Sequence, residues 1–191
     1  MTALQTPHIA VVHRTTNAAA VPTVAVETVA QKATRYVFAG LRIALGWIFL
    51  WAFLDKLFGL GHETAAAKAW INGGSPTTGF LAKGTAGPFA EFYQGLAGAA
   101  WADWLFMAGL LGIGVALIAG IGIRVAAVAG GLLMVLMWTA VLPPANNPFM
   151  DDHLIYAGVL AALALVKAGD TLGLGKIWAS VPLVKRAPWL K

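Results

Sequence analysis

The sequence contains no cysteine and few charged residues. The absence of cysteine excludes disulfides, thiolate metal sites and persulfide chemistry on the chain itself. Asp, Glu, Lys and Arg make up 11% of the 191 residues, whereas soluble domains carry about a quarter. Because 59% of the residues are hydrophobic and the mean hydropathy is +0.76, the sequence predicts a membrane protein.

Phosphate-binding motifs are also lacking, since the glycines lie in apolar stretches and form no Walker loop or dinucleotide fingerprint. The net charge of +5 would suggest nucleic acid as the partner of a soluble protein. Here the basic residues flank apolar stretches, where they set the orientation of membrane helices. We therefore expect membrane lipid, and no nucleic acid, among the partners.

Four apolar stretches have the composition of membrane helices. Roughly 20 helical residues cover a hydrocarbon core of about 30 Å. The sequence thus predicts an all-α membrane protein with a four-transmembrane-helix bundle over 34–169. The helices are expected at about 37–58, 102–121, 124–142 and 152–168. We further predict a mobile cytoplasmic tail over 1–33 and a basic amphipathic cytoplasmic tail over 170–191, lying on an anionic membrane surface.

Basic residues near the helix ends decide the predicted orientation. They gather before the first helix, at the turn between the second and third, and after the fourth. The connection after the first helix has more acids than bases. Since positive flanks of short connections stay in the cytoplasm, both termini are predicted to be cytoplasmic. We expect a multi-pass protein of the cell (inner or cytoplasmic) membrane.

The connection over 61–100 is long for a compact protein, and such segments are often functional. Ala65–Ile71 has helix-forming composition, 72–76 has the residues of a turn, and Pro88–Leu96 is a candidate short helix. Its aromatic residues suit a membrane interface. We interpret this extracytoplasmic insertion either as a lid over a site or as a structural cap of the bundle.

Small residues recur on the second predicted helix, at Gly109, Gly112 and Gly114. Such faces let membrane helices approach one another closely. We interpret them as packing positions within the bundle, with association of two copies as the alternative. A homo-oligomer therefore stays among the possible assemblies.

The stretch 146–156, Asn-Asn-Pro-Phe-Met-Asp-Asp-His-Leu-Ile-Tyr, is polar at the start of an apolar helix. Asp151 is predicted to cap that helix, because an aspartate there accepts hydrogen bonds from free backbone N–H groups. Asp152 and His153 then have capacity for proton transfer or ligand contact, and a histidine in water titrates near pH 6.5. We select Asp152 and His153 as catalytic candidates.

Metal binding is not predicted. His62 and His153 lie on different elements and show no ligand spacing of the HxxxH kind. A mixed His/Asp site at the outer mouth of the bundle is the alternative.

Two further charged positions interrupt the first predicted helix. At its end, Asp55 and Lys56 are catalytic candidates, because ionisable groups at the edge of a membrane bundle are functional candidates by default. The simpler interpretations are a local ion pair or snorkelling; alternatively Lys56 pairs with Asp151 or Asp152, or attracts an anion. Near its start, Arg42 either snorkels to the headgroups or binds backbone carbonyls, a lipid phosphate or a quinone carbonyl inside the bundle.

With these residues in place, the chain resembles the DoxX/DoxD family of small four-helix bacterial and archaeal membrane proteins. The resemblance extends over about 35–175 and is carried by 42–57, 120–127 and 147–156. Trp70-Ile71-Asn72-Gly73-Gly74 and Gly79-Phe80-Leu81 make the chain similar to the longer, DoxD-type members.

This resemblance implies quinone-linked oxidation of thiosulfate or another small sulfur compound, with a second oxidoreductase subunit as partner. Quinone would be the electron acceptor, Asp152 and His153 would relay its two protons, and Trp138 or Tyr156 would pack its ring. Arg42 is the third candidate for contact with the quinone. The alternative is a non-catalytic anchor or assembly subunit, because no redox centre is evident in the chain. A small transporter is disfavoured, since no discontinuous polar midplane segment is evident.

Overall fold

The structure is a computed structural model of the chain, and it describes residues 27–191. Residues 1–26, which hold most of the predicted cytoplasmic tail, lie outside the described residues. Within 27–191 the chain is helical and contains no strand. The all-α prediction is therefore confirmed for the part of the chain that the structure describes.

Four long helices form the bundle, namely α1 (Val29–Phe58), α4 (Ala100–Ala119), α5 (Ile123–Ala140) and α6 (Asp152–Leu165). Each overlaps one of the four predicted stretches, although α1 begins earlier than predicted and α6 ends at Leu165 rather than at 168. By length and composition, α1, α4 and α5 can each cross a membrane. With 14 residues, α6 is shorter, and at about 1.5 Å per residue it spans roughly 21 Å.

The first helix begins at Val29, eight residues before the predicted start. A capping box explains the difference: the N–H of Gln31 donates to Oγ1 of Thr28, and the N–H of Thr28 donates to Oε1 of Gln31. The prediction placed the start at the first apolar run and missed this polar signal. Residues 29–37 of α1 are exposed and extend past the bundle.

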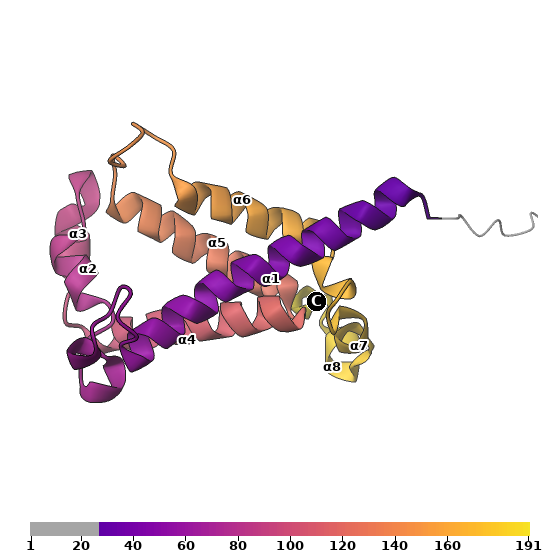
Figure 1. Cartoon of the computed structure of the whole chain (residues 1–191), viewed down its shortest axis with the longest axis horizontal. Helices are drawn as coiled ribbons and strands as arrows, with labels where there is room; N and C mark the ends of the chain where they lie inside the picture. The colour runs from indigo at the N-terminus through magenta and orange to yellow at the C-terminus, as the bar shows by residue number, and fades with distance from the viewer. Residues whose placement is uncertain (1–26) are drawn as a thin grey trace, which may run out of the picture.

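The bundle consists of two helix pairs (Figure 1). Helix α1 packs along α4, and α5 packs along α6, while α4 and α5 join the pairs. Glycines allow the close approach, because a Cβ on Gly114 would lie 2.8 Å from the backbone nitrogen of Leu50 and one on Gly46 would lie 2.9 Å from Leu117 Cβ. Gly114 is thus used inside the bundle as predicted, whereas Gly109 and Gly112 have no atom within 4 Å of an added Cβ.

The two ends of the bundle differ in what covers them. At the insertion end, the ends of α1 and α5 and the start of α4 contact residues 59–99, which include α2 (Thr78–Lys83) and α3 (Ala90–Gln94) (Figure 1). The start of α6 lies at the same end of the bundle (Figure 1). Three 3-10 helices complete this insertion, at Ala66–Lys68, Trp70–Asn72 and Gly87–Phe89. Short helices were predicted at 65–71 and 88–96, and the structure forms them partly as 3-10 turns. Helix α2 was not predicted.

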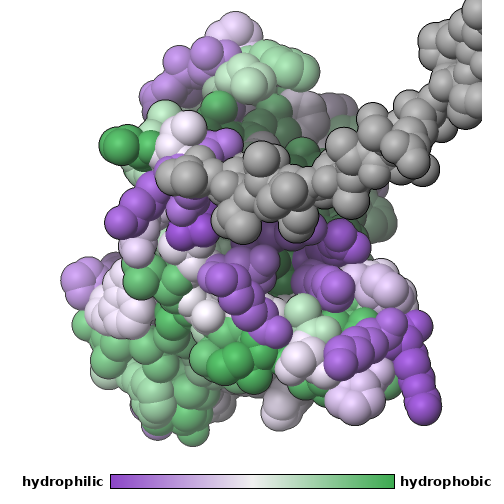
Figure 2. Space-filling model, turned by 90° about the vertical axis from the view of Figure 1, so that its right-hand side faces the viewer, coloured by the Kyte–Doolittle hydropathy of each residue, from purple (hydrophilic) through white to green (hydrophobic). Residues whose placement is uncertain are grey.

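At the terminal end, the turn between α4 and α5 is covered by residues 167–191, the terminal segment. This segment contains α7 (Gly175–Ser180) and α8 (Pro182–Arg186), with 3-10 turns at Ala168–Asp170 and Pro188–Leu190. It folds back on the bundle, because the N–H of Leu174 donates to Ala119 O (2.9 Å) and that of Arg124 donates to Lys191 O (2.8 Å). Hydrophilic side chains gather over this end (Figure 2).

Candidate functional site

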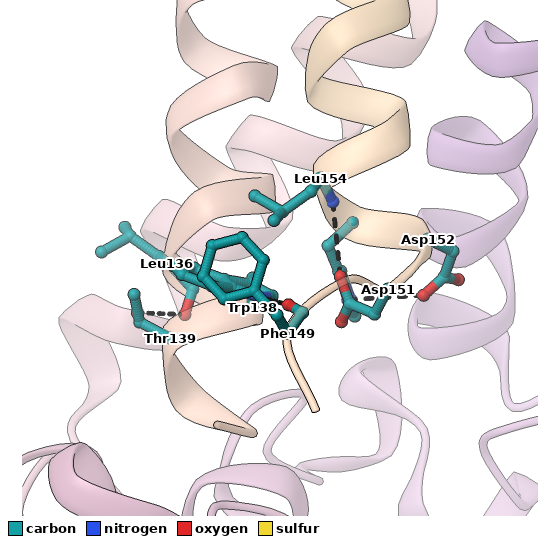
Figure 3. A network of polar contacts seen from close by, with 8 residues as sticks. Leu136, Trp138, Thr139, Phe149, Asp151, Asp152 and Leu154 are labelled. Carbon is teal, nitrogen blue, oxygen red and sulfur yellow. Dashed lines mark hydrogen bonds and ion pairs between the residues drawn. The ribbon is translucent and has the colours of Figure 1, made fainter. Parts of the chain in front are cut away.

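The polar stretch at the start of α6 is held by Asp151. Its backbone is extended (φ −140°, ψ −177°), and its Oδ1 accepts the N–H of Leu154 at 3.3 Å. The predicted capping role is therefore confirmed. The second carboxylate oxygen, Oδ2, lies 2.7 Å from Nδ1 of His153, so one aspartate both caps the helix and orients the imidazole (Figure 3).

Asp152 is the second carboxylate near the imidazole of His153. Its Oδ1 is 3.6 Å from Nδ1 of His153, and its side chain is 67% exposed. The side chain of His153 is only 23% exposed. Both carboxylates therefore face the same ring nitrogen of His153, and only that of Asp151 is within hydrogen-bond distance. A cluster of two carboxylates and an imidazole has the groups that proton transfer needs. These three side chains also lie within 4.8 Å of one another, close enough to contact one cation.

Trp138 supports the loop that precedes Asp151. Its Nε1–H donates to the carbonyl of Phe149 (2.8 Å), and the two rings meet edge to face at 5.4 Å (Figure 3). Oδ1 of Asn147 accepts the N–H groups of Phe149 and Met150, which closes the loop from within. Phe149 and Met150 remain exposed beside Asp152 in the chain. Tyr156 is partly buried against the bundle core one turn further along α6.

Asp55 is buried, with 1% of its surface exposed, at the end of α1. Its two oxygens accept the N–H groups of His62 (3.2 Å) and Glu63 (3.0 Å). Asp55 therefore fixes the start of the insertion. Among residues 27–191 Lys56 forms no ion pair, so both the local pair and the pair with Asp151 or Asp152 are wrong.

Asp103, at the start of α4, fixes a second point of the insertion. A single oxygen, Oδ1, accepts from Ser75 Oγ (2.9 Å), Thr77 N (3.1 Å) and Thr77 Oγ1 (2.6 Å). This use of Asp103 was not predicted. The hydroxyl-rich run Ser75-Pro76-Thr77-Thr78 was the available signal, since such side chains supply donors in turns.

Tyr93 fixes the third point and was also missed. It is buried on α3, its hydroxyl donates to Leu136 O (3.1 Å), and it lies 2.6 Å from Oγ1 of Thr139. Nearby, Gly87 lies so close to Leu142 O that a Cβ could not fit, and its φ is +68°. With anchors on α1, α4 and α5, the insertion has the contacts of a structural cap.

Arg42 belongs to the other end of the bundle. It is fully buried, and its guanidinium donates to four carbonyls, those of Leu117, Ile118, Thr171 and Leu172. Snorkelling is therefore wrong, and the alternative with backbone carbonyls is confirmed. Thirteen residues of helix separate Arg42 from Asp55, about 20 Å along α1, so Arg42 does not share a site with the polar stretch of α6.

Comparison with known proteins identifies the family. The family model described as DoxX matches residues 37–143, more than half of the chain. The match covers Arg42, Asp55 and Asp103 and stops before the capped start of α6. No curated protein and no solved structure matches the chain significantly. On the strength of the matched segment, the chain belongs to the DoxX family.

Proposed function

We propose that this DoxX protein is the membrane subunit of a quinone-linked oxidoreductase of the DoxD type, in the cell (inner) membrane. The observation that carries the proposal is the His153 imidazole, whose Nδ1 lies 2.7 Å from Asp151 and 3.6 Å from the exposed Asp152. In the proposed topology four helices cross the membrane with both termini cytoplasmic. The basic terminal end and the acid-rich insertion end support this orientation.

The proposed chemistry needs both electrons and protons, because reduction of a quinone to a quinol takes two of each. His153 would protonate one quinone oxygen and regain its proton through the solvent-facing carboxylate of Asp152. The exposed side chains of Phe149 and Met150 would contact the quinone ring, with Trp138 behind them. Electrons would come from thiosulfate, from another small sulfur compound or from a partner subunit, and Lys56 would attract an anionic donor.

The test is thiosulfate-dependent reduction of a quinone analogue by membranes that contain the protein. An Asp152→Asn/His153→Gln double variant retains Asp151, and thus the helix cap, but lacks both the imidazole and the exposed carboxylate. We expect its rate to fall at least ten-fold, within the range of about 10²–10⁴ that general acid–base catalysis contributes. A Glu91→Gln/His62→Gln variant removes an exposed acid and an exposed histidine of the insertion and should keep the wild-type rate. Equal rates in both variants would reject the site.

A second candidate function is that of a docking subunit without catalysis. It is favoured by the aromatic side chains exposed at the insertion end. Phe89 and Phe92 are on the insertion that Asp55, Asp103 and Tyr93 hold in place, and Trp101 and Trp104 are on the first turns of α4. A soluble oxidoreductase that reduces quinone only when this chain is present, and that a Phe89→Ser/Phe92→Ser variant no longer binds, would support this function. Turnover by the purified chain alone would contradict it.

A further inference from the structure

The terminal end contains a cavity of about 190 Å³ between the α4–α5 turn, the end of α6 and the terminal segment. That volume is well above the roughly 10–15 Å³ that admits one water. Three cationic residues line it, Arg124, Lys167 and Lys191, against one acid, Asp170. The cavity therefore carries an excess of positive charge beside the ends of helices that can cross a membrane.

Lys167 occupies an unusual backbone conformation at this cavity. It follows α6 in the left-handed region (φ +52°), the position where helices usually place glycine. A side chain there strains the backbone, because its Cβ crowds the carbonyl oxygen. The chain nevertheless places a cation at this point, and the cation faces the cavity lined by Arg124 and Lys191. The backbone conformation alone does not require a cation, because Leu172 in the same segment also has a positive φ (+50°). What bears on an anion is that the charge of Lys167 lines the same cavity as those of Arg124 and Lys191.

An apolar groove of about 370 Å³ lies between α4 and α5. Its walls include Gly109, Gly112 and Ala129, and both glycines have no atom within 4 Å of an added Cβ. Gly122 and Trp178 line both the groove and the cationic cavity. The indole N–H of Trp178 donates to Leu190 O (2.6 Å), which fixes the ring between the two.

We propose that this end binds one anionic glycerophospholipid, with its phosphate in the cationic cavity and an acyl chain in the α4–α5 groove. Lysine and arginine side chains in basic pockets at the cytoplasmic ends of membrane helices attract such headgroups, and an apolar groove between membrane helices matches an acyl chain. A tryptophan between them is typical of the membrane interface. The site lies at the opposite end from His153 and does not depend on the proposed oxidoreductase function.

Lys167 is the residue to change, because Arg124 also donates to Pro188 O (3.1 Å) and holds the terminal segment. The protein is reconstituted in vesicles of equal parts phosphatidylcholine and phosphatidylglycerol, and the lipids retained after extraction are counted by native mass spectrometry. Wild type should retain one phosphatidylglycerol. Lys167→Gln should retain it about five-fold less, as expected for the loss of one cation near the headgroup. Lys176→Gln, an exposed cation of α7 outside the cavity, should behave as wild type.

Two further variants separate lipid binding from folding and from other occupants. Lys167→Gly relieves the left-handed backbone, so it should unfold at the same or a higher temperature and still lose the lipid. Gly112→Leu fills the groove and should release phosphatidylglycerol while inorganic phosphate binds as before.

Four results would overturn the proposal. These are equal retention of phosphatidylcholine, equal loss in Lys176→Gln and Lys167→Gln, full competition by inorganic phosphate, and conversion of a dimer to a monomer by Gly112→Leu. The first two would mean unspecific adsorption, the third a free anion site, and the fourth a second copy of the chain in the groove.

Discussion

At the insertion end the buried charges are carboxylates, Asp55 and Asp103, which accept hydrogen bonds from loop N–H and hydroxyl groups. At the terminal end the buried charge is the guanidinium of Arg42, which donates to carbonyls of α4 and the terminal segment. Each sign matches the groups it meets, because the last carbonyls of a helix lack partners and carry the negative end of its dipole. The insertion after α1 instead offers unpaired N–H donors.

This comparison distinguishes buried charges with a structural role from exposed charges that are available for function. Asp55, Asp103 and Arg42 have their hydrogen bonds directed inward and little or no exposed surface. Asp152 and Lys167 are exposed, and neither is needed to hold a neighbouring loop by any side-chain hydrogen bond among residues 27–191. We therefore expect substitutions of the first group to change stability, and those of the second to change activity or lipid binding.

The largest effect is expected for Arg42→Met. The variant removes a side-chain donor from four carbonyls, of which Leu117 O keeps the N–H of Gly120 at 3.3 Å. An unpaired buried acceptor costs about 1–3 kcal/mol. We predict a loss of at least about 4 kcal/mol in the free energy of unfolding, measured in detergent by thermal or urea denaturation. The control is Arg35→Met, an exposed position on the same helix, which should change stability by less than about 0.5 kcal/mol. Equal effects would show that the carbonyl contacts of Arg42 contribute little.

Substitution of one glycine at each end tests whether the insertion and the terminal segment detach from the bundle independently. A Cβ at Gly169 would overlap Gly120 O, and one at Gly87 would overlap Leu142 O. Overpacking of this kind costs about 1–3 kcal/mol. Gly169→Ala should increase proteolysis within the terminal segment only, and Gly87→Ala within the insertion only, both followed by mass spectrometry. Gly79→Ala, where the added Cβ meets nothing within 4 Å, is the control. Cleavage at both ends in either variant would mean that the ends are coupled.

Asp55 and Asp103 differ in how many of their oxygens are used. Each oxygen of Asp55 accepts one N–H, so Asp55→Asn points an amide NH2 at a donor and should cost about 1.5 kcal/mol. Asp103 uses Oδ1 for all three of its hydrogen bonds, and Asp103→Asn can keep them. The expected cost there is below about 1 kcal/mol. Hydrogen-exchange protection of the His62 and Thr77 amides measures the two effects separately. An equal loss of protection in the two variants would contradict the predicted difference between Asp55 and Asp103.

Much of the bundle could be predicted because long apolar runs determine where membrane helices form. The ends of α4 and α5 lie within two residues of the predicted ones. The start of α1 was missed because its signal, Thr28 and Gln31, is polar and outside the apolar run. Helix α2 was missed because six residues between turns carry little periodicity.

The candidate site was predicted in part. The cap at Asp151 follows from local chemistry, since its partners lie within three residues. The roles of Asp55 and Arg42 depend on groups that only the fold brings near, and Arg42 meets carbonyls 75 to 130 residues away. The strained Lys167 has no sequence signal, because lysine carries no preference for a positive φ.

The smallest changes in stability are expected at the start of α6. There the adjacent residues Asp151 and Asp152 test whether a structural charge and a functional charge can be told apart. Asp151→Ala removes the cap and the partner of His153, and should lower the free energy of unfolding by about 1 kcal/mol. Asp152→Ala removes an exposed carboxylate and should change it by less than about 0.5 kcal/mol. The rates of quinone reduction should rank the two positions the other way round, because turnover depends on proton supply. Asp152→Ala should slow turnover. Asp151→Asn keeps one acceptor for the cap and should have a rate nearer to that of wild type. If Asp152→Ala lowered the free energy of unfolding more than Asp151→Ala, the carboxylate of Asp152 would have a structural role. Asp152 could then no longer be assigned as the residue that supplies His153 with protons from solvent.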